Sequence, residues 1–455
     1  MPTILGANTL STGAYEVANS LRLNGDAYGQ KSISSSGSGT TATFSAWVKP
    51  SALPDKALFT SYIDSNNFVE IYFNSGQFRV YHYDGGSVSN DVQTNAYFRD
   101  QSAWYHFHVI FDTTNGTEAD RIQMYVNGTR LTDFKTANYP TSSQDLELNS
   151  SSATFNLAAR NGDEQFKGYM AEVVWLDGTA SAVTNFGEYD EDSPTIWKPK
   201  DVSGLPFGTN GFYLDFEDSS NLGNDVSGGT DFTETNLAAT DQSTDTCTNN
   251  FVTWNPLDNA RTYSGTIDLS EGNLRQSNAN DASLISTVAV NKGKWYMEFK
   301  VENSHNTRTF GIIDMAESNG YVGHHSVASA VSYGYKSSTG TLYIGTSEQA
   351  SSVGTTGAGD IVSIALDLDS STNSIKWQKN GSNLSGTTEL SLSHTGYYWA
   401  ISCRCDGGQN ITANFGSPPY SISSGNSDAN GHGNFEYAVP SGYFALCTKN
   451  LAEFG

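Results

Sequence analysis

Apolar and polar residues alternate with period two through much of the chain. In the segment 121–126, Ile122, Met124 and Val126 alternate with more polar residues, and 294–301 and 361–366 show the same spacing. Because successive side chains of a strand point to opposite faces, this pattern predicts half-buried β-strands. A slip of one residue would expose the whole apolar set, so the pattern also specifies the register.

Turn signals separate the predicted strands. Asn127-Gly128 and Asn380-Gly381 are the residue pair most typical of a two-residue hairpin turn, and glycines also follow the polar residues at 74–76 and 84–86. We therefore expect the segment 375–379 to pair with 361–367 and then to turn back at Asn380. Many short strands with such turns predict β-sandwiches or barrels.

The length and one change of composition predict the domain organisation. A chain of 455 residues holds two or three domains. Residues 218–250 are rich in Ser, Asn, Gly, Thr and Asp, which indicates a polar linker or a connection that follows the surface, anchored by Leu222, Phe232 and Leu237. We predict one domain at 1–217, with a short N-terminal arm, and another at 251–455.

Charge and apolar content exclude several partners. The net charge is −24 and the pI is near 4.5, so phosphate backbones and anionic membranes would repel the surface. We therefore expect no nucleic acid partner. No stretch approaches 18 apolar residues and the N-terminus lacks a basic start, so we expect neither membrane insertion nor a secretory signal. The four cysteines are too few for a disulfide framework and are predicted to be buried thiols.

Four segments of the first half carry a resemblance to a known family. Phe44–Pro50, Trp104–Asp112, Met124–Gly128 and Phe166–Val174, in this order, resemble laminin-G-like, concanavalin-like jelly rolls over roughly residues 15–217. The segment Gly211–Phe216 looks like the closing strand. The resemblance implies a β-sandwich that binds ligands at its loops or on a sheet face.

The second half resembles SPRY domains over about residues 255–450. The matching segments, in order, are Gly293–Val301, Thr309–Ile313, Ser332–Tyr335, Gly359–Asp369 and Ala413–Gly416. This resemblance implies a second β-sandwich that recognises partners rather than catalyses a reaction. The expected fold class is all-β, with two β-sandwich (jelly-roll) domains in tandem, concanavalin-like and then SPRY-like.

Catalytic motifs are sparse. Glucanases of the jelly-roll type place carboxylates on one strand as Glu-X-Asp-X-X-Glu, because retaining hydrolysis needs two of them close together. The nearest match has Glu188 and Asp190, but Ser193 replaces the third carboxylate and Pro194 follows. No serine-nucleophile elbow, zinc-protease motif or P-loop occurs. We therefore expect a protein that is not an enzyme.

Binding residues are expected where tyrosines accompany amide and carboxylate groups, because sugars need flat rings together with hydrogen-bond partners. The low-specificity candidates are Asn66, Tyr81, Tyr83 and Asp84 in the first domain and Tyr321, His324, His325 and Tyr333 in the second. The competing interpretation is that tyrosines on polar strand faces are ordinary surface residues. By contrast, the tryptophans at 47, 104, 295 and 377 lie within apolar alternation and are predicted to be buried in the cores.

One loop offers oxygen ligands for a metal ion. Asp112, Asn115, Glu118 and Asp120 occur within nine residues, and Ca²⁺ prefers such oxygen ligands. The loop is not an EF-hand, and acidic loops are often only solvated. Calcium is therefore the one candidate cofactor, and otherwise no cofactor is expected.

A more specific resemblance concerns the setting. Segments 4–8, 15–24, 208–216, 222–225 and 249–258 look like structural proteins of marine tailed phages. This implies a virion protein, a tail fibre or a capsid fibre or decoration, with other virion proteins and host-surface polysaccharide as partners. It also implies a homo-oligomer, with a trimer favoured. The alternatives are a purely structural decoration protein without host contact and a glycan hydrolase.

Overall fold

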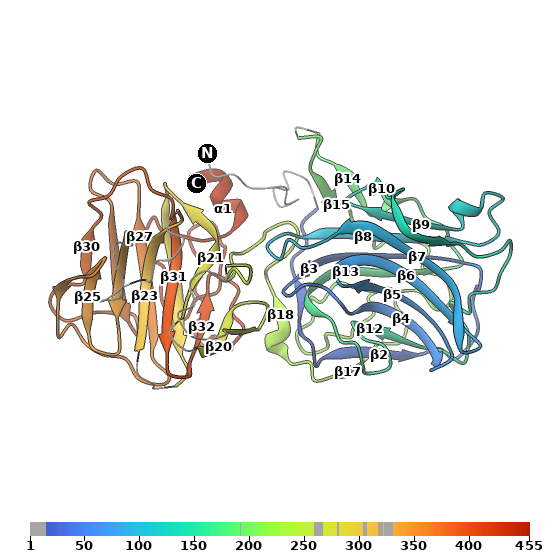
Figure 1. Cartoon of the computed structure of the whole chain (residues 1–455), viewed down its shortest axis with the longest axis horizontal. Coiled ribbons are helices and arrows are strands. Elements are labelled where there is room, and N and C mark those ends of the chain that lie inside the picture. Colours follow the sequence, from blue (N-terminus) through green and yellow to red (C-terminus); the bar gives the residue numbers. More distant parts are fainter. Residues whose placement is uncertain are drawn as a thin grey trace. The chain divides into compact units, whose positions relative to one another are not determined.

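A computed structural model describes residues 15–191, 193–258, 267–279, 282–303, 307–316, 322 and 331–455. The described residues up to Asn249 form one compact unit and those from Asn250 form another (Figure 1). Both units consist of β-sheets, which confirms the all-β prediction. Among the described residues, no helix is long and apolar enough to cross a membrane.

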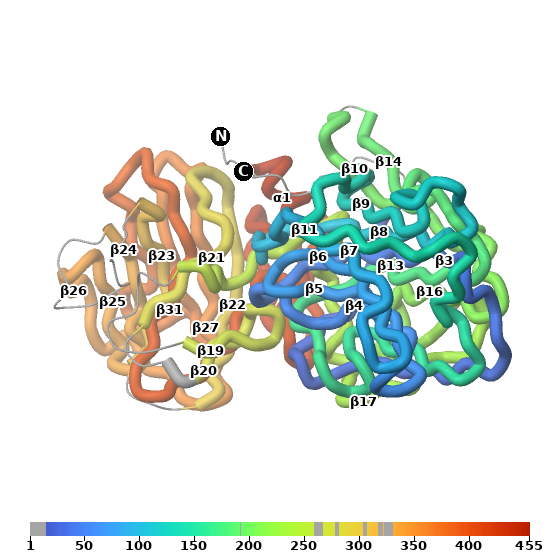
Figure 2. Tube along the Cα trace, turned by 45° about the vertical axis from the view of Figure 1, so that its right-hand side comes forward, coloured from blue at the N-terminus to red at the C-terminus, as the bar shows by residue number. Residues whose placement is uncertain are grey.

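The first unit is a sandwich of two antiparallel sheets. Sheet A has the order β10 (Thr129–Arg130), β9 (Ile122–Val126), β8 (Tyr105–Asp112), β3 (Thr41–Pro50), β13 (Lys167–Asp177), β1 (Ser20–Asn24) and β18 (Gln242–Ser243), and β16 (Phe212–Leu214) also pairs with β13. Sheet B has the order β11 (Phe134–Asn138), β7 (Ser87–Tyr97), β6 (Gln77–Asp84), β5 (Asn67–Asn74), β4 (Ala57–Asp64), β12 (Thr154–Leu157), β2 (Tyr28–Ser32) and β17 (Thr233–Thr235). Figure 2 shows β4, β5 and β6 running side by side.

The second unit also has two main sheets. Sheet C has the order β19 (Asp268–Ser270), β20 (Arg275–Ala279), β32 (Gln409–Asn414), β22 (Lys294–Val301), β27 (Ile361–Asp367), β28 (Ser374–Lys379) and β29 (Ser382–Asn383), with β30 (Glu389–Ser391) on β28 and β33 (Phe444–Ala445) on β22. Sheet D has the order β21 (Ala282–Val290), β31 (Trp399–Asp406), β23 (Thr307–Asp314), β24 (Ser332–Lys336), β25 (Thr341–Ile344) and β26 (Ser347–Ala350).

A few short elements complete the chain. In the first unit, β14 (Gly187–Tyr189) pairs with β15 (Trp197–Pro199), and single turns of 3₁₀ helix occur at η1 (Glu118–Asp120), η2 (Val183–Asn185) and η3 (Ala239–Asp241). The second unit ends in the short helix α1 (Thr448–Phe454). Its Phe454 ring stacks on Phe444 with a centroid separation of 3.8 Å, so the last residues pack on their own unit.

The predicted hairpins form as expected. Strands β27 and β28 pair in antiparallel register, and Asn380 and Gly381 follow with φ angles of 49° and 72°. Asn127 and Gly128, between β9 and β10, have φ angles of 49° and 75°. Two successive positive φ angles are the signature of a type I′ turn, which suits the twist of a hairpin.

The tryptophans are buried as predicted, but not all between the sheets. Trp295 and Trp377 belong to the second core. Trp47 and Trp104 instead lie in a smaller cluster together with Trp197, apart from the main core of the first unit. Alternation predicts that a residue is covered but does not tell which layer covers it, because both faces of β3 are buried.

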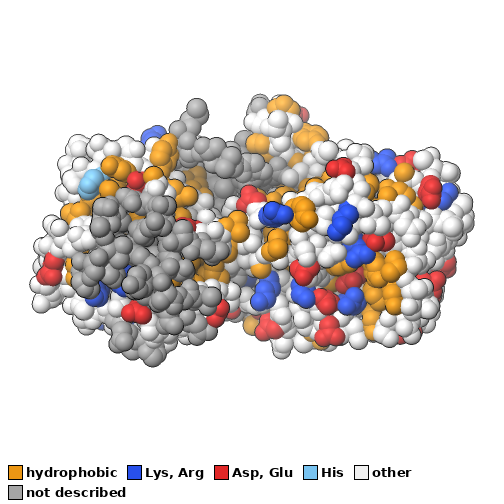
Figure 3. All heavy atoms as spheres, viewed as in Figure 1, with side chains coloured by type: hydrophobic (Ala, Val, Ile, Leu, Met, Phe, Trp, Pro, Cys, Tyr) orange, Lys and Arg blue, Asp and Glu red, His pale blue; other side chains and the backbone are white. Residues whose placement is uncertain are grey.

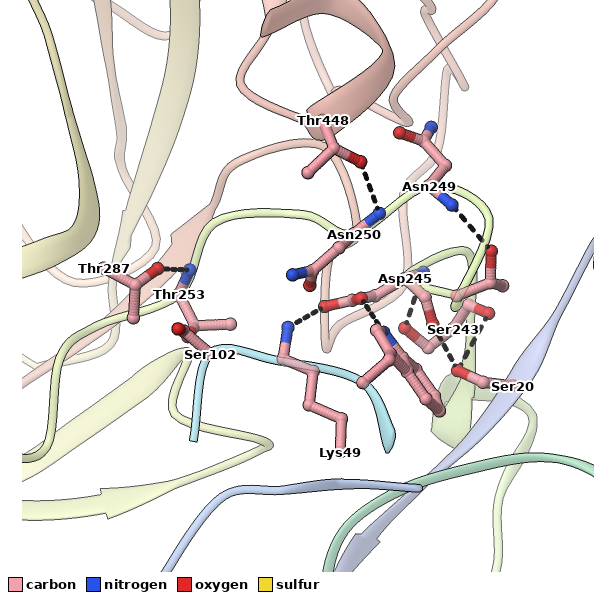
Figure 4. A network of polar contacts seen from close by, with 12 residues as sticks. Ser20, Lys49, Ser102, Ser243, Asp245, Asn249, Asn250, Thr253, Thr287 and Thr448 are labelled. Carbon is pink, nitrogen blue, oxygen red and sulfur yellow. Dashed lines mark hydrogen bonds and ion pairs between the residues drawn. The ribbon is translucent and has the colours of Figure 1, made fainter. Parts of the chain in front are cut away.

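Polar groups are also enclosed beside that smaller cluster. Lys49 Nζ lies 2.7 Å from Asp245 Oδ2, and both side chains are almost fully buried. Trp104 Nε1 donates to the other carboxylate oxygen at 3.0 Å. Figure 4 shows Lys49 and Asp245 facing one another. Removing one member of such a pair would leave a buried charge without its partner, which is strongly destabilising.

The segment 218–250, predicted as a polar linker, differs from that expectation. Up to Asn249 it belongs to the first unit, where β17 pairs with β2 and β18 pairs with β1. Leu222 and Phe232 are buried in the first core, and Leu237 packs against it. Asp225 forms a buried ion pair with Lys31, with 2.8 Å between Oδ2 and Nζ. The segment is therefore better described as a connection along the surface, anchored by these apolar residues, than as a linker.

A buried carboxylate occupies an irregular position of β13. The register shifts between Ala171 and Val174, and Glu172 there has a φ angle of 49°. Glu172 is 5% exposed, and its Oε2 accepts hydrogen bonds from the hydroxyls of Tyr15 and Tyr213, each at 2.8 Å. Burial raises the pKa of Glu172 to about 7, although both phenol hydrogen bonds favour the ionised form.

All four cysteines are buried as free thiols, as predicted. Cys403 and Cys405 share the core face of β31, with 3.7 Å between their sulfur atoms. Burial raises the pKa of the Cys247 and Cys403 thiols well above the ordinary value. These thiols are therefore poor nucleophiles.

Candidate binding surface on the first unit

Sheet B turns one face away from the core. The core takes alternate residues of β5 and β6, which leaves the intervening side chains on the outer face. These outward residues are Phe68, Glu70 and Tyr72 on β5 and Arg79, Tyr81 and Tyr83 on β6. Figure 3 shows basic, acidic and hydrophobic side chains intermixed on the visible side of this unit. We call these outward residues of β5 and β6, together with Tyr62 of β4 and Arg160, which contact Phe68, the sheet B surface.

Aromatic rings form a row across three strands of this surface. Tyr62 of β4, Phe68 of β5 and Tyr83 of β6 are neighbours in register. Ring centroids are 6.1 Å apart between Tyr62 and Phe68, 5.3 Å between Phe68 and Tyr83, and 6.0 Å between Tyr83 and Tyr81. The three interplanar angles are 27°, 26° and 19°, so the rings stack on one another. Phe68 is almost fully buried, whereas Tyr62, Tyr81 and Tyr83 are half-buried, so the tyrosines form the accessible part of the row.

A guanidinium group holds one end of the row. Arg79 lies over the Tyr81 ring, 4.6 Å from its centroid. Its Nε and Nη2 donate to the two carboxylate oxygens of Asp91 at 2.6 and 2.7 Å, and Nη1 donates to the Tyr72 hydroxyl. The Asp91 and Tyr72 hydrogen bonds raise the pKa of Arg79 although burial opposes them. This bidentate arrangement fixes the guanidinium plane and the ring beneath it.

A second guanidinium covers the middle of the row. Arg160 lies 5.1 Å from the Phe68 ring centroid, and its Nη1 is 3.2 Å from an oxygen of Glu70. Glu70 is 2% exposed, and burial raises its pKa to about 7, with the charge of Arg160 opposing the rise. Near neutral pH the Glu70 carboxylate of this ion pair is therefore partly protonated.

The candidate residues of the first domain gather at one edge of this surface. The backbone N–H of Gly86, in the β6–β7 turn, donates to the Asn66 carbonyl in the β4–β5 turn at 3.1 Å. The Tyr83 hydroxyl donates to the Gly86 carbonyl at 2.6 Å. Asn66 and Asp84 are exposed, and Tyr81 and Tyr83 are half-buried. The structure thus places all four residues near one another, although their contact with a ligand remains a prediction.

The second domain gives a different result. Tyr333, a candidate binding residue, lies in β24 with its side chain fully buried in the second core. Its hydroxyl lies 2.8 Å from His394 Nδ1 and accepts the Ser393 N–H at 2.9 Å. Tyr333 is therefore a core residue, because β24 turns Tyr333 and Tyr335 inward together. The candidates Tyr321, His324 and His325 lie outside the described residues.

Of the calcium candidates Asp112, Asn115, Glu118 and Asp120, three use side-chain oxygens within the protein, Asp112 and Asn115 in their own loop and Asp120 with a residue of β10. The side-chain oxygens of Asp112 and Asn115 accept hydrogen bonds from residues two positions further on, at 2.6 and 2.9 Å. Asp120 pairs with Arg130. In the described ranges, no three His, Cys, Asp or Glu side chains are grouped to hold a metal ion. Calcium binding stays a prediction.

The carboxylates of the incomplete glucanase motif share one cation. Lys198 Nζ lies 3.6 Å from Glu188 and 3.5 Å from Asp190. Glu188 is exposed and sits in β14, whereas Asp190 is buried just beyond it. This arrangement neutralises the carboxylates and provides no unpaired acid or nucleophile. The absence of enzymatic activity nevertheless remains a prediction.

Sequence reasoning missed Glu70, Arg79 and Arg160 as members of the surface. The alternate positions of Phe68, Glu70 and Tyr72 beside apolar neighbours were a usable signal for the outer face of β5. Arg160 follows β12, almost a hundred residues later, and only the pairing of β12 with β4 brings it close.

Residues 23–184 match the family described as the concanavalin A-like lectin/glucanases superfamily. This confirms the predicted concanavalin-like domain for these residues, which include the whole sheet B surface. A comparison with curated proteins found no match.

Solved structures similar to this chain include domains of both expected kinds. Mouse laminin alpha1 chain, domains LG4-5, is 9% identical, with 96% of this chain and 90% of that chain covered and a TM-score of 0.31. The SPRY domain of human HERC1 is 13% identical over 35% of this chain and 96% of that chain, with a TM-score of 0.28. Domain 4 of AbnA, an extracellular arabinanase of Geobacillus stearothermophilus solved with arabinotriose, is 19% identical over 38% and 82%, with a TM-score of 0.28.

Proposed function

We propose that the first unit binds carbohydrate through the sheet B surface and that the protein is a non-enzymatic surface protein of a phage virion. The observation that carries the binding proposal is the row of stacked rings beside the exposed Asn66 and Asp84. The family match of residues 23–184 supports a carbohydrate-binding type of domain. The virion setting rests on the sequence resemblance alone.

The chemistry of the surface suits a polyhydroxylated ligand. The accessible parts of the tyrosine rings offer apolar contact to the C–H groups of a sugar, and phenol, amide and carboxylate groups exchange hydrogen bonds with its hydroxyls. The hydrogen bonds of Arg79 to Asp91 and the contact of Arg160 with Glu70 keep the rings in place before the ligand arrives. A preformed surface loses less side-chain entropy on binding.

Affinity at one such open surface would be low. A trimer or other multimer presents several surfaces to one polysaccharide, and the effective concentration of the second and third sites then raises the overall affinity. Host-surface polysaccharide and other virion proteins are the proposed partners.

The test is binding of the full chain to a glycan array and to host polysaccharide. Tyr81→Ala and Tyr83→Ala should each weaken binding at least tenfold, because each removes a ring of the row. Tyr189→Ala is the matched control, since Tyr189 is exposed on β14 of the same unit. Undiminished binding by both variants, or no binding by the wild-type protein, would refute the proposal.

One observation favours a purely structural decoration protein as the second candidate. Neighbouring rings and the two guanidinium groups cover much of the ring faces, which are the surfaces on which sugars usually stack. Particles that lack the protein distinguish the two functions. Normal adsorption with fragile particles favours decoration, and lost adsorption with intact particles favours host binding.

A further inference from the structure

A lysine and a carboxylate are enclosed together near the edge of sheet B. The side chains of Lys31 in β2 and Asp225 in the segment 218–249 are 8% and 0% exposed, and 2.8 Å separates Nζ from Oδ2. Figure 1 shows β2 beside β17, which belongs to the same segment. Because a C–O bond is about 1.2 Å long, Nζ lies no more than about 4.0 Å from the Asp225 Cγ. Atoms poised to react are roughly 3–3.5 Å apart.

The ammonium group of Lys31 has few hydrogen-bond partners. It carries three N–H donors, and among the described residues Asp225 is the one group that accepts from it. The rings of Phe212 and Phe232 also lie near Nζ, each with 5.8 Å to the ring centroid. Transfer of one proton from Nζ to Oδ2 gives a neutral amine beside a carboxylic acid. Apolar surroundings disfavour charged groups, so this transfer is less costly here than in water.

The other oxygen of Asp225 lies among hydrogen-bond donors. Oδ1 accepts the backbone N–H groups of Tyr213 and Ser227, each at 3.1 Å, and the Ser227 hydroxyl at 2.6 Å. An amine that attacks Cγ places negative charge on this oxygen. Donors fixed where charge develops stabilise a transition state, as in an oxyanion hole. The arrangement therefore favours addition of an amine at Cγ.

The backbone at Gly229 covers both reacting groups. A Cβ atom at this position would lie 2.3 Å from Asp225 Oδ2 and 3.1 Å from Lys31 Nζ. Well-oriented groups within one molecule react as if one partner were present at on the order of 10⁵–10⁸ M. Proximity and the exclusion of water both favour condensation of the two groups over hydrolysis of the product.

The first unit contains a second buried pair of this kind, which serves as a comparison. Lys49 Nζ lies 2.7 Å from Asp245 Oδ2. Within the described ranges, however, Trp104 Nε1 is the one donor to the other carboxylate oxygen. Since this oxygen lacks a set of three donors, we expect Lys49 and Asp245 to remain an ion pair.

We propose that Lys31 and Asp225 condense to an amide that joins β2 covalently to the segment 218–249. Nζ gives one proton to Oδ2 and attacks Cγ, so that the N–C bond forms and Oδ1 takes the negative charge. A second proton then moves from the nitrogen to Oδ2, the Cγ–Oδ2 bond breaks and Oδ2 leaves as water. The third proton stays on the amide nitrogen, and Oδ1 becomes the amide oxygen with its donors in place. The reaction requires no other reactant and does not depend on carbohydrate binding by this unit.

The experiment is mass spectrometry of the full chain, unfolded after purification. A linked chain weighs one water molecule less than the sequence requires. Trypsin then leaves Lys31 uncut and joined to the peptide 201–261, which contains Asp225. We expect most wild-type chains to carry this link. Lys31→Arg keeps the positive charge but has no nucleophilic amine, so this variant should have its full mass.

A second variant tests the donors to Oδ1 and leaves the ion pair in place. Ser227→Ala removes the hydroxyl donor, so the linked fraction at equal times after synthesis should fall several-fold. Ser219→Ala is the matched control, because Ser219 is exposed in the same segment, and it should link like the wild-type protein. Equal linked fractions in the two variants would refute the role of these donors.

A tryptic fragment that joins Lys31 to Asp225 in the wild-type protein, and is absent from Lys31→Arg, supports the link. The proposal is overturned if the wild-type chain has its full mass and trypsin cuts at Lys31, an outcome that requires no variant to fold. A link of Lys49 to Asp245 in its place would also overturn it. So would a loss of water that persists in Lys31→Arg, because an Asp-Gly pair elsewhere can lose water by cyclising on its own backbone.

Discussion

Glu172 gives the sharpest prediction of stability. Its pKa rises from 4.5 to about 7 on folding, so the folded protein binds this proton more tightly than the unfolded chain does. The contribution to stability is therefore complete below about pH 4.5 and is lost as the pH rises to about 7. A pKa change of this size corresponds to roughly 3 kcal/mol.

Glu172→Gln removes this titration while keeping an oxygen that accepts from Tyr15 and Tyr213. Burial and the charge of Glu172 raise the pKa values of both phenols far above their ordinary value, so the hydroxyls remain donors throughout. The variant should match or fall slightly below the wild-type stability at pH 5, because its new N–H donors must find partners. The wild-type protein loses up to roughly 3 kcal/mol between pH 5 and pH 8, so at pH 8 the variant should be more stable than the wild type by up to that amount, measured against their difference at pH 5.

The assay is chemical denaturation of the full chain from pH 4.5 to 8.5, with the transition of the first unit followed separately from that of the second. Glu217→Gln is the control, since Glu217 is exposed close to the same cluster. Glu70 titrates in the same range and keeps part of the pH dependence in the variant. If Glu172→Gln and the wild-type protein show parallel pH profiles, the carboxylate is not the cause of the dependence and the reasoning is wrong.

Three further predictions concern the architecture of the first unit. Gly128→Ala should destabilise it by about 1–3 kcal/mol, because φ is +75° and the new Cβ would lie 2.4 Å from Trp197; denaturation curves measure the loss, and an unchanged midpoint would contradict it. Phe232→Ala should lower the unfolding free energy of the first unit alone by roughly 3–5 kcal/mol, measured from the midpoint of each thermal transition. An unchanged midpoint of the first unit would mean that residues 218–249 do not belong to its core. Subtilisin should cut within residues 218–249 no faster than within the strands, and early fragments cut in this segment would indicate a free linker instead. Subtilisin is used because the segment contains no Lys or Arg at which trypsin could cut.

Local pattern predicted the strands and turns well because each depends on a few neighbouring residues. The alternation at 121–126 and 361–366 fixed which side chains face the core, and Asn127 and Asn380 marked turns that need positive φ angles. Tyr333 was proposed as a binding residue from its residue type alone, whereas Tyr333 and Tyr335 share the inward face of β24 and lie in the core.

Features that depend on distant pairing could not be predicted from one sequence. The polar composition of 218–249 indicates a linker, and the ion pair that holds it in place joins Asp225 to Lys31, 194 positions earlier. Similarly, Glu70 looks like an ordinary surface residue until the pairing of β12 with β4 brings Arg160 beside it. Composition describes a segment, whereas burial depends on which strands meet.

The pairing of β1 with β18 also determines when the first sandwich can form during synthesis. Ser20 leaves the ribosome early, but its partner Ser243 follows more than two hundred residues later. At roughly 5–20 residues per second, the nascent chain waits for ten seconds or more with the edge of β1 unpaired and Lys31 without its carboxylate. Closure of this sandwich is therefore largely a late event of translation, and substitutions near residue 243 should influence yield from the cell more strongly than their small contact area suggests.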